Sequence, residues 1–495
     1  MSALLVAGTT SDAGKSVVTT GLCRAFARRG VKVAPYKAQN MSNNSMVTPD
    51  GAEIGRAQWV QAVAARAVPE AAMNPVLLKP GSDRRSHVVV MGRPFGHLDA
   101  GRFAGGRAAL AEAAFAAYDD LAARYDVLVC EGAGSPAEIN LRADDYVNMG
   151  LARHGRIPTL LVGDIDRGGV FAAMHGTVAL LEAADQALLA GFVVNKFRGD
   201  VTLLEPGLDA LERLTGRPVL GVLPWLPELW LDSEDSLALR DRAAAPSEVR
   251  DRLRVAVVVL PRISNFTDVD ALCLEPGLDV VFVDSPRAVA SADVVVLPGT
   301  RSTIEDLGWL RSRGLADAVV AHAGRGGVVL GICGGFQMLG AEVRDPGGVE
   351  GRPGAVVAGL GLLDVRTEFT AEKVLRLPSG SALGVPASGY EIHHGRVTVG
   401  DADPFLGGAR AGSVFGTMWH GSLEGDELRR AWLREVSGLV GVPAFEPGTV
   451  GFAAAREARI DALADAVEEH VDVAAVLDLV SSGAPPLPLV RGGLA

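Results

Sequence analysis

Two segments of this chain carry residue types that can do chemistry, and they lie far apart in the sequence. Residues 8–16 read GTTSDAGKS and combine two glycines with a lysine and a serine directly after an apolar run. Residues 331–335 read GICGG and present Cys333 between glycines, and His420 follows in the segment MWHG. Backbone N–H groups and a lysine can hold phosphate, whereas a thiol beside a histidine can attack a carbonyl carbon. The two segments therefore predict a phosphate site and a nucleophilic thiol on one chain.

The glycine-containing segment is a variant of the P-loop pattern G-x-x-x-x-G-K-[ST]. Five residues instead of four separate Gly8 from Gly14, and a threonine stands where that pattern has its first glycine. The loop still leads from an apolar run into a helical pattern, so its N–H groups and the helix N-terminus can bind phosphate. Lys15 supplies charge, and the Ser16 hydroxyl can reach Mg²⁺. We expect nucleotide contacts from Gly8, Thr10, Gly14, Lys15 and Ser16.

Further polar residues end other apolar runs. Glu131 follows the run 127–130 in a glycine-rich turn, where a carboxylate is well placed to bind Mg²⁺. Asp164 and Asp166 end another run and are alternatives near the metal, between which the sequence does not choose. Asn195 ends the run 191–195 and is a candidate for a hydrogen bond to adenine. Together these residues predict ATP and Mg²⁺ as cofactors.

The thiol segment predicts a strand over 327–332, a tight turn and a helix over 336–339. Glycines on both sides of Cys333 allow this turn, and the N-terminus of a helix favours a thiolate. N–H groups at Gly334 and in residues 297–300 (LPGT) are candidates for stabilising an oxyanion. His420 would act first as a base and then as an acid. We therefore predict Cys333 and His420 as the catalytic residues.

The composition excludes several classes of protein. A net charge of −12 argues against a nucleic-acid partner or an anionic membrane partner, because both need a basic face. The four cysteines contain no CxxC pair, which predicts a reducing compartment with neither disulfides nor a structural zinc site. We see no signal peptide, and no apolar stretch reaches the roughly 20 residues of a membrane helix. We expect a cytoplasmic protein.

The elements that must position these residues are strand patterns that alternate with helical patterns. Short continuous apolar runs are typical of parallel strands that are buried on both faces, and helical patterns over 17–29 and 107–124 lie between them. This predicts a doubly wound domain followed by a second α/β domain. The runs expected to form strands are 4–7, 31–34, 127–130, 159–162, 191–195 and 219–223 in the first half, and 255–260, 280–283, 294–297 and 328–331 in the second.

The chain divides into four parts on this interpretation. We expect a P-loop synthetase domain over 1–235, a linker over 236–252, an α/β domain with the thiol over 253–440, and a helical extension over 441–495. The linker prediction depends on a stretch of charges and an AAAP segment without clear periodicity. Residues 481–495 are expected to form a loose terminus.

Each half resembles a known group of domains. The longer loop resembles the dethiobiotin-synthetase group of nucleotide-binding domains, which implies a second phosphate-facing or substrate-facing lysine at Lys37. The second half resembles the class I glutamine amidotransferases, whose triad has a glutamate two residues past the histidine. Here Ser422 stands at that place, and Glu424 and Glu391 are possible stand-ins. The cobyrinic-type subgroup shares this departure, and residues 389–395 (GYEIHHG) resemble it as well.

Longer segments make the resemblance narrower, because they are similar to those of the cobyric acid synthase family. They are residues 37–45 (KAQNMSNNS), 55–58 (GRAQ), 73–80 (MNPVLLKP), 131–140 (EGAGSPAEIN), 164–171 (DIDRGGVF) and 260–266 (LPRISNF). The resemblance implies stepwise amidation of the b, d, e and g carboxylates of adenosylcobyrinic acid a,c-diamide, with L-glutamine as nitrogen donor. Basic residues are expected to hold this polyanionic corrinoid: Arg56, Lys79, Arg84, Arg142 and Arg198.

Three alternatives remain beside this interpretation. The sibling a,c-diamide synthase has a similar two-domain plan, and residues 39–42 and 73–80 argue against it. A partitioning-type P-loop ATPase leaves Cys333 and His420 without a role. A glutaminase with a degenerate ATP domain is opposed by Lys15, Ser16 and Glu131, which are all present. The sequence fixes neither the order of the amidations nor an oligomeric state.

Overall fold

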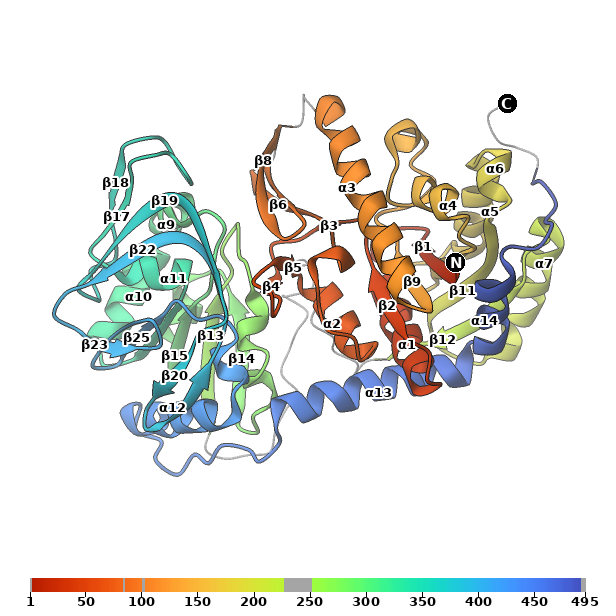
Figure 1. Cartoon of the computed structure of the whole chain (residues 1–495). Helices are drawn as coiled ribbons and strands as arrows, with labels where there is room; N and C mark the ends of the chain where they lie inside the picture. Colours follow the sequence, from red (N-terminus) through yellow and green to blue (C-terminus); the bar gives the residue numbers. More distant parts are fainter. Residues whose placement is uncertain (1, 83–84, 100–102, 227–251, 491–495) are drawn as a thin grey trace.

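The computed structural model describes residues 2–82, 85–99, 103–226 and 252–490. Two α/β units lie beside each other, and a long helix runs from the second unit along the first (Figure 1). We call them the nucleotide unit, which precedes residue 227, and the thiol unit, which begins at residue 252. The linker expected over 236–252 lies outside the described residues except for residue 252.

The nucleotide unit is built on a six-stranded parallel sheet of order β12-β11-β10-β1-β9-β2. Each of the six apolar runs expected in this half overlaps one of its strands, and the run expected over 31–34 is displaced by two residues, because β2 begins at Val33. The expected fold class is confirmed, because short runs of this kind are buried on both faces of a parallel sheet. The strands are β1 (Ser2–Gly8), β2 (Val33–Tyr36), β9 (Val127–Glu131), β10 (Thr159–Asp164), β11 (Leu189–Phe197) and β12 (Val219–Pro224).

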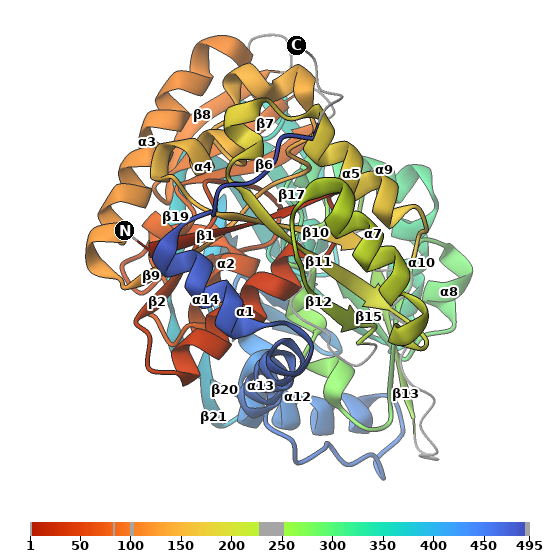
Figure 2. The same ribbon diagram turned by 90° about the vertical axis from the view of Figure 1, so that its right-hand side faces the viewer.

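Helices cover both faces of this sheet (Figure 2). Alternate residues of β1 show why: Leu4 and Val6 pack in one apolar cluster with α1, whereas Leu5 packs in another with α3 and α5. The helices of the unit are α1 (Lys15–Arg28), α2 (Arg56–Ala64), α3 (Phe103–Arg124), α4 (Met149–Gly155), α5 (Val170–Leu180), α6 (Ala183–Gln186) and α7 (Glu205–Thr215).

An excursion between β2 and α3 was not expected from the sequence. It forms a four-stranded sheet of order β3-β6-β7-β8 and a hairpin of β4 and β5, on the side of the nucleotide unit that faces the thiol unit (Figure 1). Strands β3, β4 and β5 have three residues each, and β6, β7 and β8 include proline, glycine or charged residues, so the excursion gives little periodic signal. They are β3 (Gln39–Met41), β4 (Ser45–Val47), β5 (Glu53–Gly55), β6 (Val76–Ser82), β7 (Arg85–Val90) and β8 (Arg93–Asp99).

The thiol unit has a seven-stranded sheet of order β14-β13-β15-β16-β25-β24-β23, parallel from β14 to β25. The strands are β13 (Leu253–Val258), β14 (Leu278–Val283), β15 (Val294–Leu297), β16 (Val328–Ile332), β23 (Asp403–Phe405), β24 (Gly408–Ala411) and β25 (Val414–Thr417). The helices around it are α8 (Pro286–Ala290), α9 (Thr303–Ser312), α10 (Leu315–Gly324), α11 (Gly334–Leu339) and α12 (Asp426–Leu439).

The thiol unit has further strands outside this sheet, and Ile392 of one of them packs against Met46 and Val47 of the nucleotide unit. One sheet has the order β18-β17-β19-β22, and β20 pairs with β21. The bounds are β17 (Glu342–Asp345), β18 (Ala355–Ala358), β19 (Val365–Arg376), β20 (Ser379–Ala382), β21 (Val385–Ser388) and β22 (Glu391–Val399).

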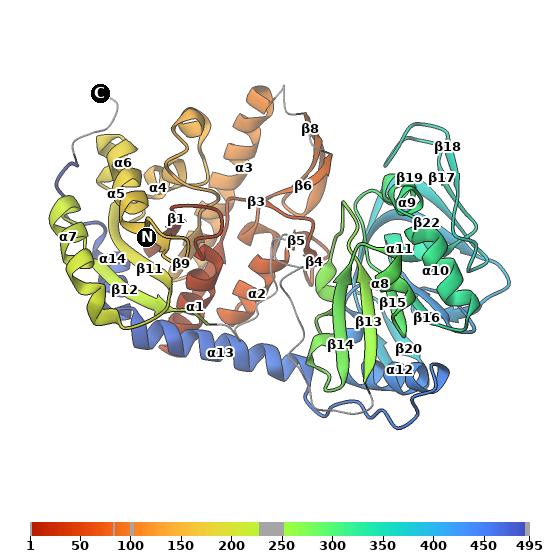
Figure 3. The ribbon, with the colours of Figure 1, turned by 180° about the vertical axis from the view of Figure 1, so that it is seen from behind.

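The C-terminal extension returns to the nucleotide unit as two helices, α13 (Phe452–His470) and α14 (Val473–Ser482), which is clear from behind (Figure 3). Arg28 on α1 pairs with Asp461 on α13 at 2.9 Å, and apolar residues of α13 complete the cluster beneath α1. The terminus is not loose as far as residue 490, because the N–H of Val490 donates to Gln186 Oε1 at 2.9 Å. The extension therefore ties the end of the chain to the nucleotide unit.

Candidate active sites

The phosphate-type loop lies where β1 ends and α1 begins, as the sequence predicts. The Nζ of Lys15 donates to the carbonyl oxygens of Thr10 at 2.9 Å, Ser11 at 3.1 Å and Gly134 at 3.1 Å. Gly14 has a φ of 98°, which a residue with a side chain rarely adopts. Lys15 therefore closes the loop on itself and joins it to the turn after β9.

Asn195 lies against the same loop. Its Nδ2 donates to the carbonyl oxygen of Ala13 at 2.9 Å, and a Cβ added to Gly14 would lie 1.9 Å from this nitrogen. The amide thus fixes the backbone of the loop. The hydrogen bond from Asn195 to adenine stays a prediction.

Glu131 is the centre of a buried group of polar side chains at the carboxyl end of β9. Its Oε1 accepts from Ser16 Oγ at 2.9 Å and from Lys37 Nζ at 2.8 Å, and its Oε2 accepts from Gln61 Nε2 at 2.5 Å. Burial alone would raise the pKa of Glu131, but Lys37, Gln61 and Lys15 favour its charged form and hold the pKa below its ordinary value. Sequence reasoning missed Gln61, since nothing but its place on α2 marks it.

The two alternative acids have other partners. Asp164 Oδ2 accepts from Lys196 Nζ at 2.7 Å, and Asp166 pairs with Arg198 at 3.3 Å. Within the described residues, no group of three or more His, Cys, Asp or Glu side chains is arranged to hold a metal ion. At the start of α1, the side-chain oxygens of Ser16 and Glu131 meet, 2.9 Å apart.

Cys333 occupies a strained turn between β16 and α11. Its φ of 50° and ψ of −108° are unusual for a residue with a side chain, and its N–H donates to the carbonyl oxygen of Thr417 at 2.7 Å. A Cβ on Gly335 would lie 1.9 Å from the carbonyl oxygen of Leu297, so this position requires glycine. The close approach brings the 297–300 segment against the start of α11, beside the thiol.

His420 lies in the same cavity as Cys333, with 1% of the residue exposed. Its Nδ1 is 2.7 Å from Asp268 Oδ2, and its ring stacks on Tyr390 at 5.4 Å between centroids. Burial disfavours the charged ring, but the charges of Asp268 and Cys333 outweigh this and raise the pKa of His420 to about 10. His420 is therefore an imidazolium at neutral pH and lies beside the thiol of Cys333.

The third member of the triad differs from both stand-ins that the sequence offered. Glu424 pairs with Arg56 at 2.7 Å, and Glu391 pairs with Arg376 at 2.6 Å. The acid on the histidine is instead Asp268, on the short helix η5 (Phe266–Val269). Its only signal in the sequence is its place just after the segment 260–266, because proximity to His420 arises from the fold.

The two units meet beside this triad. Met46 and Val47 of β4 pack with Tyr390 and Ile392 of the thiol unit in one buried cluster. Arg56 was expected to bind substrate. In the structure it pairs instead with Glu424 of the thiol unit and so joins the two units. The thiol site and the interface thus share Tyr390.

A second contact between the units lies at η5. The side-chain oxygen of Asn44 accepts from the N–H of Phe266 at 3.2 Å, and the side-chain oxygen of Asn265 accepts from the N–H of Ser45 at 3.0 Å. These crossed bonds hold the segment that carries Asp268.

The remaining basic candidates fall in different places. Lys79 lines the cavity of Cys333, Arg142 forms two hydrogen bonds with Asp185, and Arg198 lies over the ring of Trp225. The side chain of Arg84 lies outside the described residues.

These observations define a class of protein: a nucleotide-binding unit with a P-loop-type loop, joined to an α/β unit in which a cysteine, a histidine and an aspartate meet in one cavity. Residues 4–237 match the family model described as a CobQ/CobB/MinD/ParA nucleotide binding domain, and residues 254–428 match a CobB/CobQ-like glutamine amidotransferase domain.

Two relatives match nearly the whole chain. A cobyric acid synthase of Mycobacterium tuberculosis (strain ATCC 25618 / H37Rv) is 68% identical over 100% of both chains. Another, of Mycolicibacterium gilvum, is 69% identical over 98% of this chain and 97% of its own. A solved glutamine amidotransferase is 22% identical over 38% of this chain and 98% of its own, with a TM-score of 0.30.

The chain belongs to the cobyric acid synthase family. It is a carbon–nitrogen ligase that takes nitrogen from glutamine, and its reaction is an amidation in cobalamin biosynthesis. Across the described residues, no helix has the length and apolar character needed to cross a membrane.

Proposed function

We propose that the protein amidates the b, d, e and g carboxylates of adenosylcobyrinic acid a,c-diamide to give adenosylcobyric acid, using one ATP and one glutamine per amide. The observation that carries this proposal is the presence of a thiol site and a phosphate-type loop on one chain that matches cobyric acid synthases over its full length. Both sites are needed, because a carboxylate is a poor electrophile and ammonia in neutral water is mostly non-nucleophilic ammonium.

The nitrogen half of the reaction uses the triad. The thiolate of Cys333 attacks the amide carbon of glutamine, and the N–H groups at Gly334 and in residues 297–300 stabilise the oxyanion. Because His420 is already protonated, it acts first as an acid and not, as the sequence suggested, first as a base. It gives its proton to the departing nitrogen, and ammonia leaves. Water then adds to the thioester, gives a proton to His420, and releases glutamate and the thiolate.

The phosphate half uses the loop. A substrate carboxylate oxygen attacks the γ-phosphorus of ATP, and ADP leaves. Ammonia then attacks the carbonyl carbon of the acyl phosphate, and phosphate leaves as the amide forms. Lys15 and Lys37 supply positive charge for the transfer, which is supported by their positions at the loop and beside Glu131.

The residues at the loop fit a magnesium ion. Ser16 Oγ and Glu131 Oε1 are hard oxygen donors 2.9 Å apart, and Mg²⁺ usually takes only one or two protein oxygens and completes its shell with water and phosphate. When bound, Mg²⁺ neutralises charge on the β- and γ-phosphates. We propose Ser16 and Glu131 as its protein ligands.

We propose that the corrinoid binds in the pocket beside the loop. This pocket of about 320 Å³ includes Ser11 of the loop and the exposed apolar side chains of Met41 and Leu141. Arg107 and Arg142 also line it, and they pair with Asp144 and Asp185 of the chain. Glu138, Asp144 and Asp145 line the pocket as well. The proposal therefore depends on the apolar floor, which suits the face of a large ring.

Mass spectrometry of corrinoid products after incubation with ATP, Mg²⁺ and glutamine tests the proposal. Each amidation removes one negative charge, so intermediates are expected to bind less tightly and to appear transiently between the diamide and the hexaamide. Unamidated cobyrinic acid should be a poor substrate. Rapid amidation of that acid at its a and c positions would identify the sibling a,c-diamide synthase instead.

We propose a cytoplasmic location. None of the four cysteines, which all lie in the described part of the chain, forms a disulfide. This agrees with a reducing compartment. Fractionation of cells that express a tagged chain tests it, and recovery in the membrane fraction would contradict it.

A further inference from the structure

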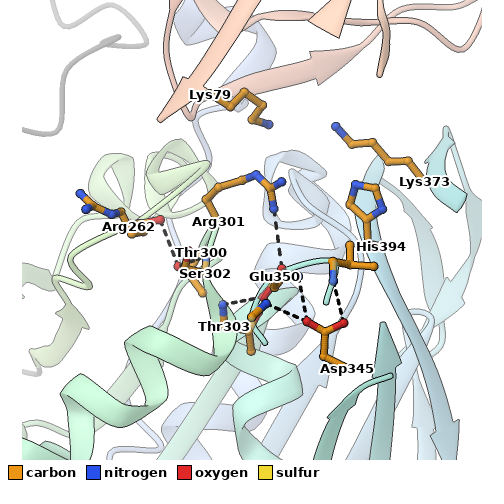
Figure 4. A network of polar contacts seen from close by, with 12 residues as sticks. Lys79, Arg262, Thr300, Arg301, Ser302, Thr303, Asp345, Glu350, Lys373 and His394 are labelled. Atoms are coloured by element: carbon orange, nitrogen blue, oxygen red, sulfur yellow. Dashed lines mark hydrogen bonds and ion pairs between the residues drawn. The ribbon is translucent and has the colours of Figure 1, made fainter. Parts of the chain in front are cut away.

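The cavity that contains Cys333 crosses the boundary between the two units. Arg301, Glu350, Lys373 and His394 of the thiol unit line it, and Lys79 of the nucleotide unit completes it (Figure 4). The inner cavity is narrow, with a volume of about 30 Å³.

A second pocket of about 230 Å³ adjoins this cavity on the outside. It lies between β7 and β8 of the nucleotide unit and the loop at Gly348 of the thiol unit. The two pockets share four basic residues: Lys79, Arg301, Lys373 and His394. A molecule that reaches the thiol from this side must pass between these side chains.

The cluster at this junction has an excess of positive charge. Glu53 Oε1 lies 2.7 Å from Lys79, and Glu53 Oε2 accepts from Lys373. Burial opposes ionisation of Glu53, but the two lysines hold its pKa well below its ordinary value. One firmly ionised carboxylate therefore faces two lysines and Arg301.

Glu350, the second acid of the cluster, does not neutralise the excess positive charge. Glu350 is 3.8 Å from Arg301, and burial raises the pKa of Glu350 to about 7. Its Oε2 accepts from the N–H of Thr303 at 2.8 Å, and Asp345 fixes its loop by accepting from the N–H groups of residues 349–351 (Figure 4). Glu350 is thus held at the edge of the cationic cluster.

Two polar atoms that line the inner cavity have no hydrogen-bond partner. They are Nε2 of Gln337 and Nε2 of His393. The Nδ1 of His393 lies 2.8 Å from the carbonyl oxygen of Gly395, and burial lowers the pKa of His393 to about 3. The neutral ring therefore leaves its Nε2 as an acceptor, and Nε2 of Gln337 is a donor. A buried donor and a buried acceptor without partners are costly unless a ligand meets them.

We propose that glutamine enters through this junction between the units and is held there by its amino-acid end. Arg301, Lys373 and Lys79 bind the α-carboxylate, Glu350 binds the α-ammonium, and the carboxamide reaches Cys333. The inference rests on the glutamine-dependent function proposed above.

A consequence is that the glutamine site is complete only when the two units are together. Lys79 Nζ also donates to Ser45 Oγ at 2.9 Å, and the N–H of Ser45 donates to Asn265 of the thiol unit. The nucleotide unit thereby supplies both a charge to the glutamine and a support to the triad.

Two analogues of glutamine test the contacts to its α-carboxylate and to its α-ammonium separately. 4-Aminobutanamide is glutamine without its α-carboxylate, and glutaramate is glutamine without its α-ammonium. We would measure KM for glutamine and the inhibition constant of each analogue against glutamine hydrolysis, using the full chain. The variants are Lys79→Gln, Arg301→Gln, Lys373→Gln and Glu350→Gln.

The three cation variants should raise KM for glutamine roughly 10- to 100-fold, the usual effect of losing a charged hydrogen bond. Their inhibition constant for 4-aminobutanamide should change less than about threefold, because this analogue has no carboxylate to lose. Glu350→Gln should raise KM for glutamine but leave the inhibition constant of glutaramate near that of the wild type. Lys32→Gln, which removes an exposed lysine elsewhere on the nucleotide unit, is the matched control and should leave KM unchanged.

Inhibition constants for 4-aminobutanamide that rise in parallel with KM would mean that the cations only support the fold, and would overturn the inference. An unchanged KM in all three cation variants would overturn it as well. Absence of glutamine hydrolysis by the wild type would instead refute the proposed function itself.

Discussion

The carboxylate of Asp268 lies 2.7 Å from Nδ1 of His420, although 152 positions separate the two residues in the chain. The other oxygen of Asp268 accepts from the N–H of Gly421 at 2.8 Å, so the carboxylate fixes both the ring and the backbone beside it. This leaves Nε2 of the ring for Cys333. The acid of the triad therefore comes from the loop after β13 and not from the segment after the histidine.

Replacement of Asp268 by asparagine should lower the kcat of glutamine hydrolysis on the order of 10²–10⁴-fold, because the ring loses its orienting charge. Amidation from a high concentration of ammonium should persist, since that reaction does not use the triad. Glu391→Gln is the matched control, because Glu391 pairs with Arg376 and not with the histidine. Equal losses in the two variants would remove Asp268 from the triad.

The raised pKa of His420 predicts a shift of the pH profile. The ring stays protonated until the pH approaches about 10, so kcat/KM for glutamine hydrolysis should fall on an alkaline limb near that value. In the Asp268→Asn variant the pKa drops, and the limb should move to lower pH. An alkaline limb at the same pH in both proteins would contradict the assignment.

The same shift has a consequence for stability. Because the folded pKa lies above the ordinary value of 6.5, the stabilisation is fully present below pH 6.5 and is lost as the pH rises through about 10. The difference in free energy of unfolding between wild type and Asp268→Asn should therefore shrink between pH 6 and pH 10 in urea titrations.

Cys333→Ala should abolish glutamine-dependent amidation and spare amidation from ammonium, because the two half-reactions use separate sites. Lys15→Ala is the matched contrast and should remove amidation from both nitrogen sources, since no acyl phosphate forms. Glutamine hydrolysis at the wild-type rate by the cysteine variant would show that Cys333 is not the nucleophile. Ammonium-dependent amidation at the wild-type rate by the lysine variant would refute the role of Lys15.

Glu131→Gln should raise the Mg²⁺ concentration needed for half-maximal amidation by roughly tenfold or more, because a neutral amide is a poor ligand for a hard cation. A Mg²⁺ titration of ammonium-dependent amidation measures this. Asp166→Asn, at the alternative acid, should leave the titration unchanged. If Asp166→Asn raised the required Mg²⁺ concentration and Glu131→Gln did not, the metal site would have to be assigned to the end of β10.

Asn44→Ala should lower the kcat of glutamine hydrolysis roughly 5- to 10-fold, although Asn44 belongs to the nucleotide unit. The reason is its hydrogen bond to the N–H of Phe266, at the start of the helix that carries Asp268. Asn43→Ala is the adjacent control, because Asn43 Nδ2 donates to Pro80 within its own unit. If both variants hydrolyse glutamine like the wild type, the contact does not position the acid.

Local sequence patterns were sufficient to predict the strands that lead into the phosphate-type loop and into the thiol turn. The run before Gly8 and the run before Cys333 form buried parallel strands, because continuous apolar residues bounded by glycine suit no exposed structure. Glycine is needed at position 14 because the backbone there has a positive φ. It is needed at position 335 because the carbonyl oxygen of Leu297 lies too close for a side chain. The sequence by itself therefore predicted the fold class of both units and the phosphate-type loop and thiol turn that each presents.

Only the tertiary structure decided which distant side chains meet. Asp268 becomes the partner of His420 because η5 and η7 (Ser422–Glu424) pack against each other in the fold. Glu424 becomes the partner of Arg56 because the two units meet there. Lys79 reaches the thiol cavity because β6, in the excursion between β2 and α3, carries it there. Such contacts leave no periodic trace, since hydrogen bonds and ion pairs depend on the distance between atoms and not on spacing along the chain.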